Sequence, residues 1–194
     1  LAAIGVFVSA WIGLGFLLVS AFVLWFYRDP DRTPPSAGIV APADGRVTVI
    51  REEAGRVRVG VFMSPLDVHV NRAPLAGIVT AVEHTPGAHR PAFSKDSERN
   101  ERVRIELEVG RGVDDRAETG VDDDWSATIV LIAGAFARRI TPYVEDGDRV
   151  ARGERIGHLA FSSRADVVIP ADIPSSALQV TQQDRVRAGE TVLA

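Results

Sequence analysis

The sequence contains no cysteine, and Lys95 is the only lysine among its 22 basic residues. Without cysteine there can be no disulfides, thiolate metal sites or cysteine nucleophile. Any Schiff-base or carrier chemistry on a lysine would have to use Lys95. The net charge of −4 argues against nucleic acid as a partner. A chain of 194 residues is long enough for one domain of ordinary size.

Residues 1–27 contain no charged side chain and are almost entirely apolar. About 20 apolar residues in a helix cross the ~30 Å hydrocarbon core of a bilayer, so we expect this segment to attach the chain to a membrane. Gly13 and Gly15 leave two forms open, a transmembrane helix or a re-entrant helical hairpin. The aromatic run at 25–27 argues against a cleaved signal peptide.

Residues 28–36 form a proline-containing linker, and residues 37–194 carry the pattern of a mostly β domain. Short runs rich in β-branched residues alternate with glycine turns, and none shows a long apolar stripe at helical spacing. These runs lie at 47–50, 57–62, 77–82, 103–109, 128–132 and 166–169. The acidic stretch 114–124 is expected to form a solvated loop.

Residues 144–157 space their glycines and β-branched residues as biotinyl and lipoyl carrier domains do, and a weaker copy lies at 39–47. We therefore expect a barrel-sandwich β domain. A carrier needs an exposed lysine at a hairpin tip, and Lys95 lacks the flanking residues expected there. The spacing thus supports the fold and not the carrier function.

His69 is the main candidate for a general base. Asp67 lies two residues before it, so on a strand both side chains would face the same side. A carboxylate beside an imidazole favours proton abstraction, but a surface aspartate and a hydrogen-bonded histidine give the same pattern. Asp44, in an Asp-Gly pair, is likewise either a turn residue or a catalytic acid.

The remaining histidines and serines give weaker signals. His84 and His89 lie five residues apart with no third ligand adjacent, and we expect no metal. His158 has no partner in sequence, and we expect a structural role. Ser162 and Ser163 lack the Gly-x-Ser-x-Gly elbow of a hydrolase nucleophile. A serine beside a base can instead attack the carbonyl of the residue before it.

Several short motifs follow one another along nearly the whole chain. They are Phe26-Tyr27-Arg28-Asp29-Pro30, Ala41-Pro42-Ala43-Asp44-Gly45, and the stretches 62–72, 100–102, 132–140 and 153–170. Each is weak alone, but in this order the set resembles the phosphatidylserine decarboxylase family in its short archaeal and bacterial form. The resemblance implies an enzyme that converts a serine phospholipid, phosphatidylserine or archaetidylserine, to the ethanolamine lipid through a pyruvoyl group.

In this family a serine attacks the preceding carbonyl, and β-elimination from the resulting ester cuts the chain and leaves the pyruvoyl group. The resemblance makes Ser163 the pyruvoyl precursor, with cleavage after Ser162. His69 would be the activating base and later a proton donor, oriented by Asp44 or Asp67. It also implies a homodimer at the cell membrane, with the catalytic domain on the cytoplasmic side.

Two positions depart from the family pattern. The family has Gly-Ser at the scissile bond, where this chain has Ser162-Ser163. A Cβ disfavours the left-handed conformations open to glycine by about 1–2 kcal/mol, so we expect slow maturation and a largely uncleaved proenzyme. Arg72 stands where longer members carry a second histidine, and it is a candidate for binding the lipid phosphate or a carboxylate.

Two other functions stay open from the residues alone. One is a membrane-tethered, non-catalytic binding or carrier domain, which modification of Lys95 would indicate. The other is a Ser-His-Asp lipid hydrolase, which reaction of intact Ser163 with a fluorophosphonate would indicate. Diacyl and archaeal ether lipids both fit a decarboxylase, because the chemistry occurs at the head group.

Overall fold

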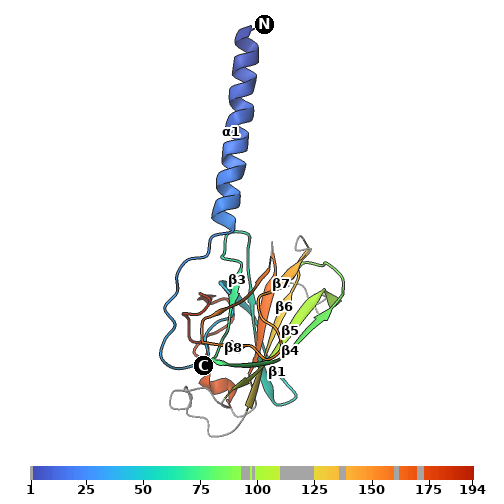
Figure 1. Ribbon diagram of the computed structural model, residues 1–194. Helices are drawn as coiled ribbons and strands as arrows, with labels where there is room; N and C mark the ends of the chain where they lie inside the picture. The colour runs from blue at the N-terminus through green and yellow to red at the C-terminus, as the bar shows by residue number, and fades with distance from the viewer. Residues whose placement is uncertain are drawn as a thin grey trace.

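The computed structural model describes residues 2–92, 97, 99–109, 125–135, 139–159, 162–169 and 173–194, with the side chains of 2–10 and of Trp125 left aside. Its first element, α1 (Ala2–Phe26), is a continuous helix that stands away from a β domain (Figure 1). Gly13 and Gly15 lie inside this helix without breaking it, so the re-entrant hairpin does not form.

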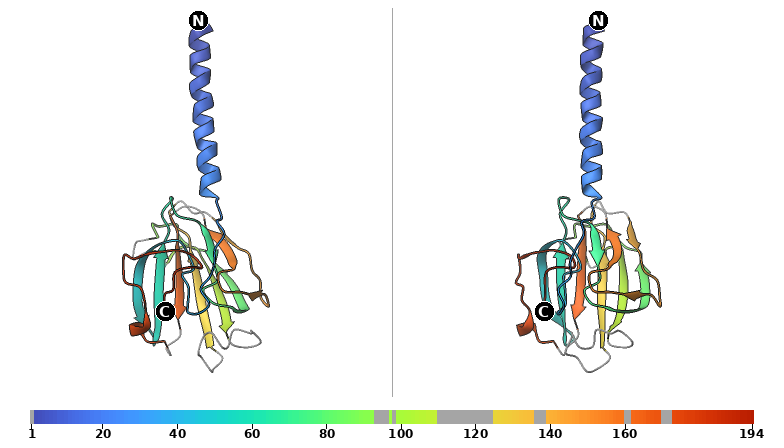
Figure 2. Two further views of the ribbon diagram at one scale, coloured as in Figure 1. Left: turned by 90° about the vertical axis from the view of Figure 1, so that its left-hand side faces the viewer. Right: turned by 60° about the vertical axis from the view of Figure 1, so that its left-hand side comes forward.

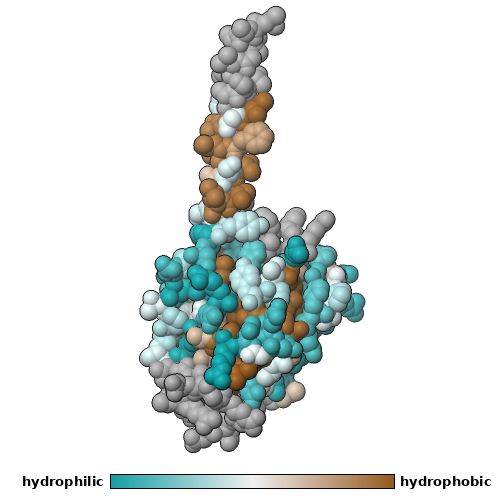
Figure 3. Space-filling view, viewed as in Figure 1, coloured by the Kyte–Doolittle hydropathy of each residue, from teal (hydrophilic) through white to brown (hydrophobic). Residues whose placement is uncertain are grey.

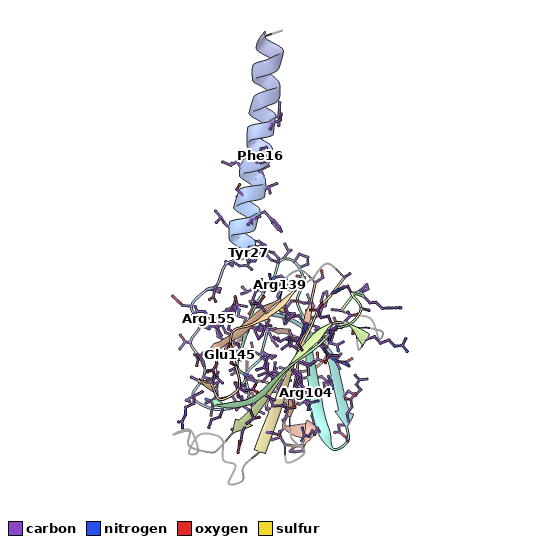
Figure 4. All side chains as sticks on the ribbon, turned by 45° about the vertical axis from the view of Figure 1, so that its right-hand side comes forward. Phe16, Tyr27, Arg104, Arg139, Glu145 and Arg155 are labelled. Carbon is purple, nitrogen blue, oxygen red and sulfur yellow. The ribbon has the colours of Figure 1, made fainter. Side chains whose placement is uncertain are left out.

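Most apolar side chains of α1 between residues 11 and 25 are exposed. Phe16 is 71% exposed and points away from the helix (Figure 4), and Leu24 is 78% exposed. The described part of α1 is mostly apolar on its visible surface, in contrast to the domain below it (Figure 3). In the part of the chain that the structure describes, no helix reaches the length and hydropathy needed to cross a membrane.

Two antiparallel sheets make up the β domain. The larger has the order β11-β1-β2-β10-β6-β5-β4-β8 and curls into a half-barrel, and the smaller has the order β3-β9-β7 (Figure 2). The strands are β1 (Gly45–Glu53), β2 (Arg56–Phe62), β3 (Val70–Arg72), β4 (Gly77–Thr85), β5 (Arg102–Val109), β6 (Trp125–Ile132), β7 (Ile140–Pro142), β8 (Arg149–Val150), β9 (Arg155–Leu159), β10 (Arg164–Ile169) and β11 (Arg185–Val186), with a short 3-10 turn, η2 (Ser175–Ala177).

The core follows from alternation along the strands. In β5 the side chains of Val103, Ile105 and Leu107 are at most 1% exposed, while the residues between them face outward or lie partly covered. This period of two places one face of the sheet in the core. The six runs of β-branched residues all lie within strands of the large sheet, which confirms the mostly β prediction.

The predicted barrel-sandwich is confirmed only in part: the large sheet curls into a half-barrel. β8 pairs with β4 in the large sheet, whereas β9 pairs with β3 and β7 in the small one. Residues 144–157 therefore do not form a hairpin within one sheet, but carry the chain from one sheet to the other. The acidic stretch 114–124 and Lys95 lie outside the described residues.

Arginines hold the linker 28–36 against the domain. Arg72 Nη2 binds Asp29 Oδ1 at 2.7 Å and the Pro30 carbonyl at 3.1 Å. Arg152 Nη1 donates to the carbonyls of Pro35 and Ser36 at 3.0 and 2.6 Å. The predicted linker is thus a segment packed along the domain.

A buried ion pair fixes the start of β10. Asp166, fully buried, receives hydrogen bonds from Arg164 Nε at 2.7 Å and Nη2 at 3.0 Å, and from Arg58 Nη1 at 3.1 Å. Gly60 lies opposite Asp166 in the β2–β10 ladder, and a Cβ there would lie 2.7 Å from Asp166 Oδ1. The sheet therefore makes room for the carboxylate only because residue 60 is a glycine.

We predict that Asp166→Ala lowers the free energy of unfolding by about 3–5 kcal/mol, because it leaves the buried Arg164 guanidinium without its counter-charge. The exposed turn residue Asp146 supplies the matched control, and Asp146→Ala should change stability by less than about 0.5 kcal/mol. Denaturant unfolding of both variants measures the difference. Equal effects would mean that the ion pair does not hold β10.

Candidate active site

Ser162 and Ser163 lie where the chain passes from the small sheet to the large one. β9 ends at Leu159 and β10 begins at Arg164, so the crossing takes only a few residues. Within it, Ser162 has a φ of +53°, in the left-handed region that favours glycine. Ser162, which stands where the family has glycine, therefore has a backbone conformation that glycine favours.

Ser163 is completely buried. Its main-chain carbonyl accepts a hydrogen bond from Met63 N at 2.9 Å, which ties the crossing to the end of β2. Its Oγ has no hydrogen-bond partner among the described residues. A buried hydroxyl left without a partner costs about 1–3 kcal/mol and is a feature of functional sites.

His69 lies immediately before β3, and β3 is the strand that pairs with β9. Leu159 N donates to the His69 carbonyl at 3.1 Å, and Val70 is opposite His158 in the β3–β9 ladder. The side chain of His69 is 1% exposed. The same pairing that leads the chain toward Ser163 thus places the histidine beside the last residues of β9.

The hydrogen bond of the His69 ring determines which nitrogen carries the proton. Nδ1 lies 3.0 Å from the main-chain carbonyl of Asp67. A carbonyl can only accept, so Nδ1 is the protonated nitrogen and the free lone pair is on Nε2. Nε2 is buried and has no hydrogen-bond partner among the described residues. This is the tautomer that a general base requires.

The pKa of His69 is lowered to about 4, mainly by burial and to a smaller extent by the neighbouring His158, against the opposing effect of the hydrogen bond to the Asp67 carbonyl. The ring of Phe26, the last residue of α1, covers the imidazole with a centroid separation of 4.4 Å. His69 is therefore neutral at pH 7 and able to accept a proton.

The carboxylates of Asp44 and Asp67 have other partners. Asp67 accepts hydrogen bonds from Ser64 N, Ser64 Oγ and Arg185 Nη2 at 2.7–2.9 Å. Asp44 is bound by Arg32 at 2.8 Å and by Ala188 N at 2.8 Å. The group that orients His69 is therefore the main-chain carbonyl of Asp67. The carboxylate of Asp67 binds the C-terminal region, and the carboxylate of Asp44 binds both the linker and the C-terminal region.

Arg72 also differs from its expected environment. Its side chain is 7% exposed, and its terminal nitrogens bind the Gly153 carbonyl at 2.9 Å, Asp29 and Pro30. These contacts anchor the linker. They leave the expected binding of a lipid phosphate by this guanidinium without support in the geometry.

His158 was expected to be structural, and the structure places it next to the candidate base. Its Nε2 is buried and unpartnered among the described residues, and burial lowers its pKa. The ring of Tyr27 lies over it at 5.4 Å between centroids. Its position five residues before Ser163 was the only sign in the sequence that it could lie near the site.

His84 and His89 meet at one carboxylate on the surface. His84 Nε2 lies 2.9 Å from Glu101 Oε1, and His89 Nε2 lies 3.6 Å from Glu101 Oε2. Among the residues that the structure describes, no group of three or more histidine, aspartate or glutamate side chains is arranged to hold a metal ion.

Comparison with known proteins shows to which family the chain belongs. The phosphatidylserine decarboxylase family matches residues 19–194. This chain belongs to that family. The resemblance seen in the ordered motifs is thereby confirmed.

Three relatives illustrate the similarity. An archaetidylserine decarboxylase proenzyme of Halobacterium salinarum is 56% identical over 187 residues, which cover 96% of this chain and 86% of that protein. A phosphatidylserine decarboxylase proenzyme of Thermobifida fusca is 49% identical, over 90% of this chain and 74% of that protein. An archaetidylserine decarboxylase proenzyme of Methanopyrus kandleri is 41% identical, over 98% and 91%.

We predict that Phe26→Leu raises the pKa of His69 from about 4 by roughly one unit, because the smaller side chain lets water reach the imidazole. NMR titration of the His69 ring carbon measures it. Phe16, exposed on the same helix, gives the matched control, and Phe16→Leu should leave that pKa unchanged. An unchanged pKa in both variants would show that Phe26 does not shield the ring.

Proposed function

We propose that this chain is the proenzyme of a pyruvoyl-dependent decarboxylase that acts on serine phospholipids and cuts itself between Ser162 and Ser163. The observation that carries the proposal is the Ser162–Ser163 bond itself. It joins a residue in a left-handed conformation to a buried serine whose Oγ has no partner among the described residues. Family membership supports the same assignment.

In the first step Ser163 Oγ attacks the carbonyl carbon of Ser162. The new C–O bond replaces the peptide C–N bond, and the hydroxyl proton passes through His69 Nε2 to the freed amine. Loss of the Ser163 Cα proton then expels the Ser162 carboxylate. The enamine left at residue 163 tautomerises to an imine and takes up water, and loss of ammonia leaves the pyruvoyl group.

The residues present fit such a group, because Ser163 is fully buried and the neutral His69 is hydrogen-bonded through its main chain to Leu159, four residues before Ser163. The pyruvoyl group supplies an electrophilic carbonyl that binds the substrate amine and takes up the electron pair left when CO2 departs. His69 Nε2, after taking up a proton from water, would supply the proton that replaces CO2. The Asp67 carbonyl keeps the ring in the required tautomer, and Phe26 excludes water from it.

Ser162 slows the first step by reducing the population of reactive chains. A residue with a Cβ enters the left-handed region at a cost of about 1–2 kcal/mol, which corresponds to a 5- to 30-fold smaller fraction in that conformation. The chain therefore stays largely uncleaved for longer than a Gly-Ser relative would. This proposal rests on the observed φ of Ser162.

The substrate class also suggests where the enzyme works. The exposed apolar surface of α1, with Trp25 and Tyr27 exposed at its lower end, suits contact with lipid, since tryptophan and tyrosine favour the membrane interface. We place the domain at the cytoplasmic surface of the cell membrane, where serine lipids lie within reach. The homodimer implied by the family remains a prediction, and size measurement in detergent tests it.

We predict that Ser162→Gly speeds self-cleavage by about 5- to 30-fold. Denaturing mass spectrometry follows a fragment covering residues 163–194 with a blocked N-terminus. Ser163→Ala is the control that removes the nucleophile and should not cut at all. If the parent chain cuts as fast as Ser162→Gly, Ser162 does not slow cleavage. If Ser163→Ala still cuts, Ser163 is not the nucleophile.

We predict that the cleavage rate of the Ser162→Gly chain changes little between pH 6 and 8. His69 with a pKa near 4 is already deprotonated throughout that range, and its protonation should reduce the rate only as the pH falls toward 4. A histidine with an ordinary pKa would halve the rate near pH 6.5. Cleavage rates measured from quenched time points at each pH distinguish a pKa near 4 from an ordinary histidine pKa.

The activity itself is tested on the cleaved Ser162→Gly chain with phosphatidylserine vesicles. Release of CO2 and formation of the ethanolamine lipid support the proposal, and loss of both after treatment with a carbonyl reagent ties them to the pyruvoyl group. Release of fatty acid or head group without CO2, together with fluorophosphonate labelling of Ser163 in the uncut parent chain, would favour the hydrolase instead.

A further inference from the structure

A cavity of about 420 Å³ lies at the base of α1, between the 64–67 segment, the start of β1 and strand β11. No pattern in the sequence indicates this cavity, because its walls come from four separated parts of the chain. The lining residues are Arg28, Asp44, Leu66, Asp67, Arg185, Val186 and Arg187. Three of these seven are arginines.

The carboxylates in the cavity are already bound, whereas Arg28 is hydrogen-bonded to carbonyl groups and Arg187 has one long ion pair, with Glu190 at 3.9 Å. Asp44 is occupied by Arg32 and Ala188 N, and Asp67 by Ser64 and Arg185. The cavity therefore presents net positive charge from the remaining guanidinium groups.

Arg28 is held by neutral groups. Its Nη1 donates to the Trp25 carbonyl at 2.9 Å, its Nη2 donates to the Leu66 carbonyl at 2.8 Å, and its guanidinium lies 3.9 Å from the centre of the Trp25 ring. These contacts fix the position of the cation without cancelling its charge. Arg187 is 74% exposed, and Glu190 approaches it only to 3.9 Å. Both groups are thus available to an anion.

The cavity also adjoins the candidate base and the apolar helix. Asp67 lines it with its side chain and holds His69 Nδ1 with its carbonyl. Leu66, 63% exposed, and Trp25, 41% exposed, stand beside Arg28. A ligand that is anionic at one point and apolar at one end would match these features.

We propose that this cavity binds the phosphodiester of the lipid head group, with Arg28 and Arg187 as its principal donors and Arg185 beside them. The inference rests on the proposed function and adds the substrate-binding site to it. Arg28 and Arg187 take the place of Arg72, whose donors are used by the linker.

The direct test is equilibrium binding of water-soluble glycerophosphoserine to the full chain carrying Ser163→Ala, which cannot cut itself. We expect Arg187→Gln to weaken binding about tenfold, and Arg28→Lys to weaken it less because it keeps the charge but loses the planar fork. Arg56, exposed at the β1–β2 turn and outside the cavity, gives the matched control, and Arg56→Gln should have no effect. Equal affinity in all variants would overturn the proposal.

Inorganic phosphate serves as the competing probe. Binding of glycerophosphoserine at least tenfold tighter than that of inorganic phosphate indicates a head-group site. Equal affinities would mean a site for free phosphate and would refute the lipid assignment. Arg187 is exposed and makes no close hydrogen bond with its carboxylate neighbour, so Arg187→Gln should fold normally, which its thermal unfolding checks.

A second arm separates this inference from the proposed function. In the Ser162→Gly chain we expect Arg187→Gln to cleave at the normal rate and to raise KM for phosphatidylserine about tenfold, with kcat nearly unchanged. An unchanged KM in an active enzyme would refute the cavity alone. Head-group binding in a chain that neither cuts nor releases CO2 would refute the decarboxylase and leave the binding site standing.

Discussion

The crossing from β9 to β10 is the constraint on which the site depends. Both ends are fixed, β9 by its pairing with β3 and β7, and β10 by the ladders to β2 and β6 and by the Arg164–Asp166 ion pair. A few residues must therefore change sheets within a short distance. The positive φ of Ser162 and the complete burial of Ser163 occur within this short passage.

The same constraint explains why a reactive constellation can exist in a stable domain. The buried Nε2 of His69 and Oγ of Ser163 lack partners among the described residues, and each such atom opposes folding. The strands around them supply the compensation, since β2, β10 and β6 place a continuous apolar face in the core. The large sheet supplies the apolar core, and the candidate reactive residues lie at its junction with the small sheet.

The sequence predicted the large sheet well and the small one poorly, for a physical reason. Runs such as 103–109 are long enough to show a period of two, whereas β3 and β7 have three residues each and show no period. His69 was proposed from its spacing to Asp67, and Ser163 from the ordered motifs; their catalytic roles stay predictions. The group that orients His69 was missed, because a main-chain carbonyl has no signature in the sequence.

Long-range partners account for the other differences. Arg185 binds Asp67 across 118 positions, and Arg32 and Ala188 together occupy Asp44. No spacing rule relates such residues, so a carboxylate two positions from a histidine looked like its partner. The same limit hid the cavity at the base of α1, whose arginines come from both ends of the chain.

The end of α1 is part of the site as well as the candidate attachment to lipid. Phe26 covers the buried His69 and Tyr27 lies over the half-buried His158, so consecutive residues at the end of α1 contact both histidines. Arg28, the next residue, lines the cavity. Any force that shifts the helix must also alter the hydration of His69, and hence its pKa. In the proposed enzyme, seating α1 in lipid and holding the base neutral are consequently one structural requirement.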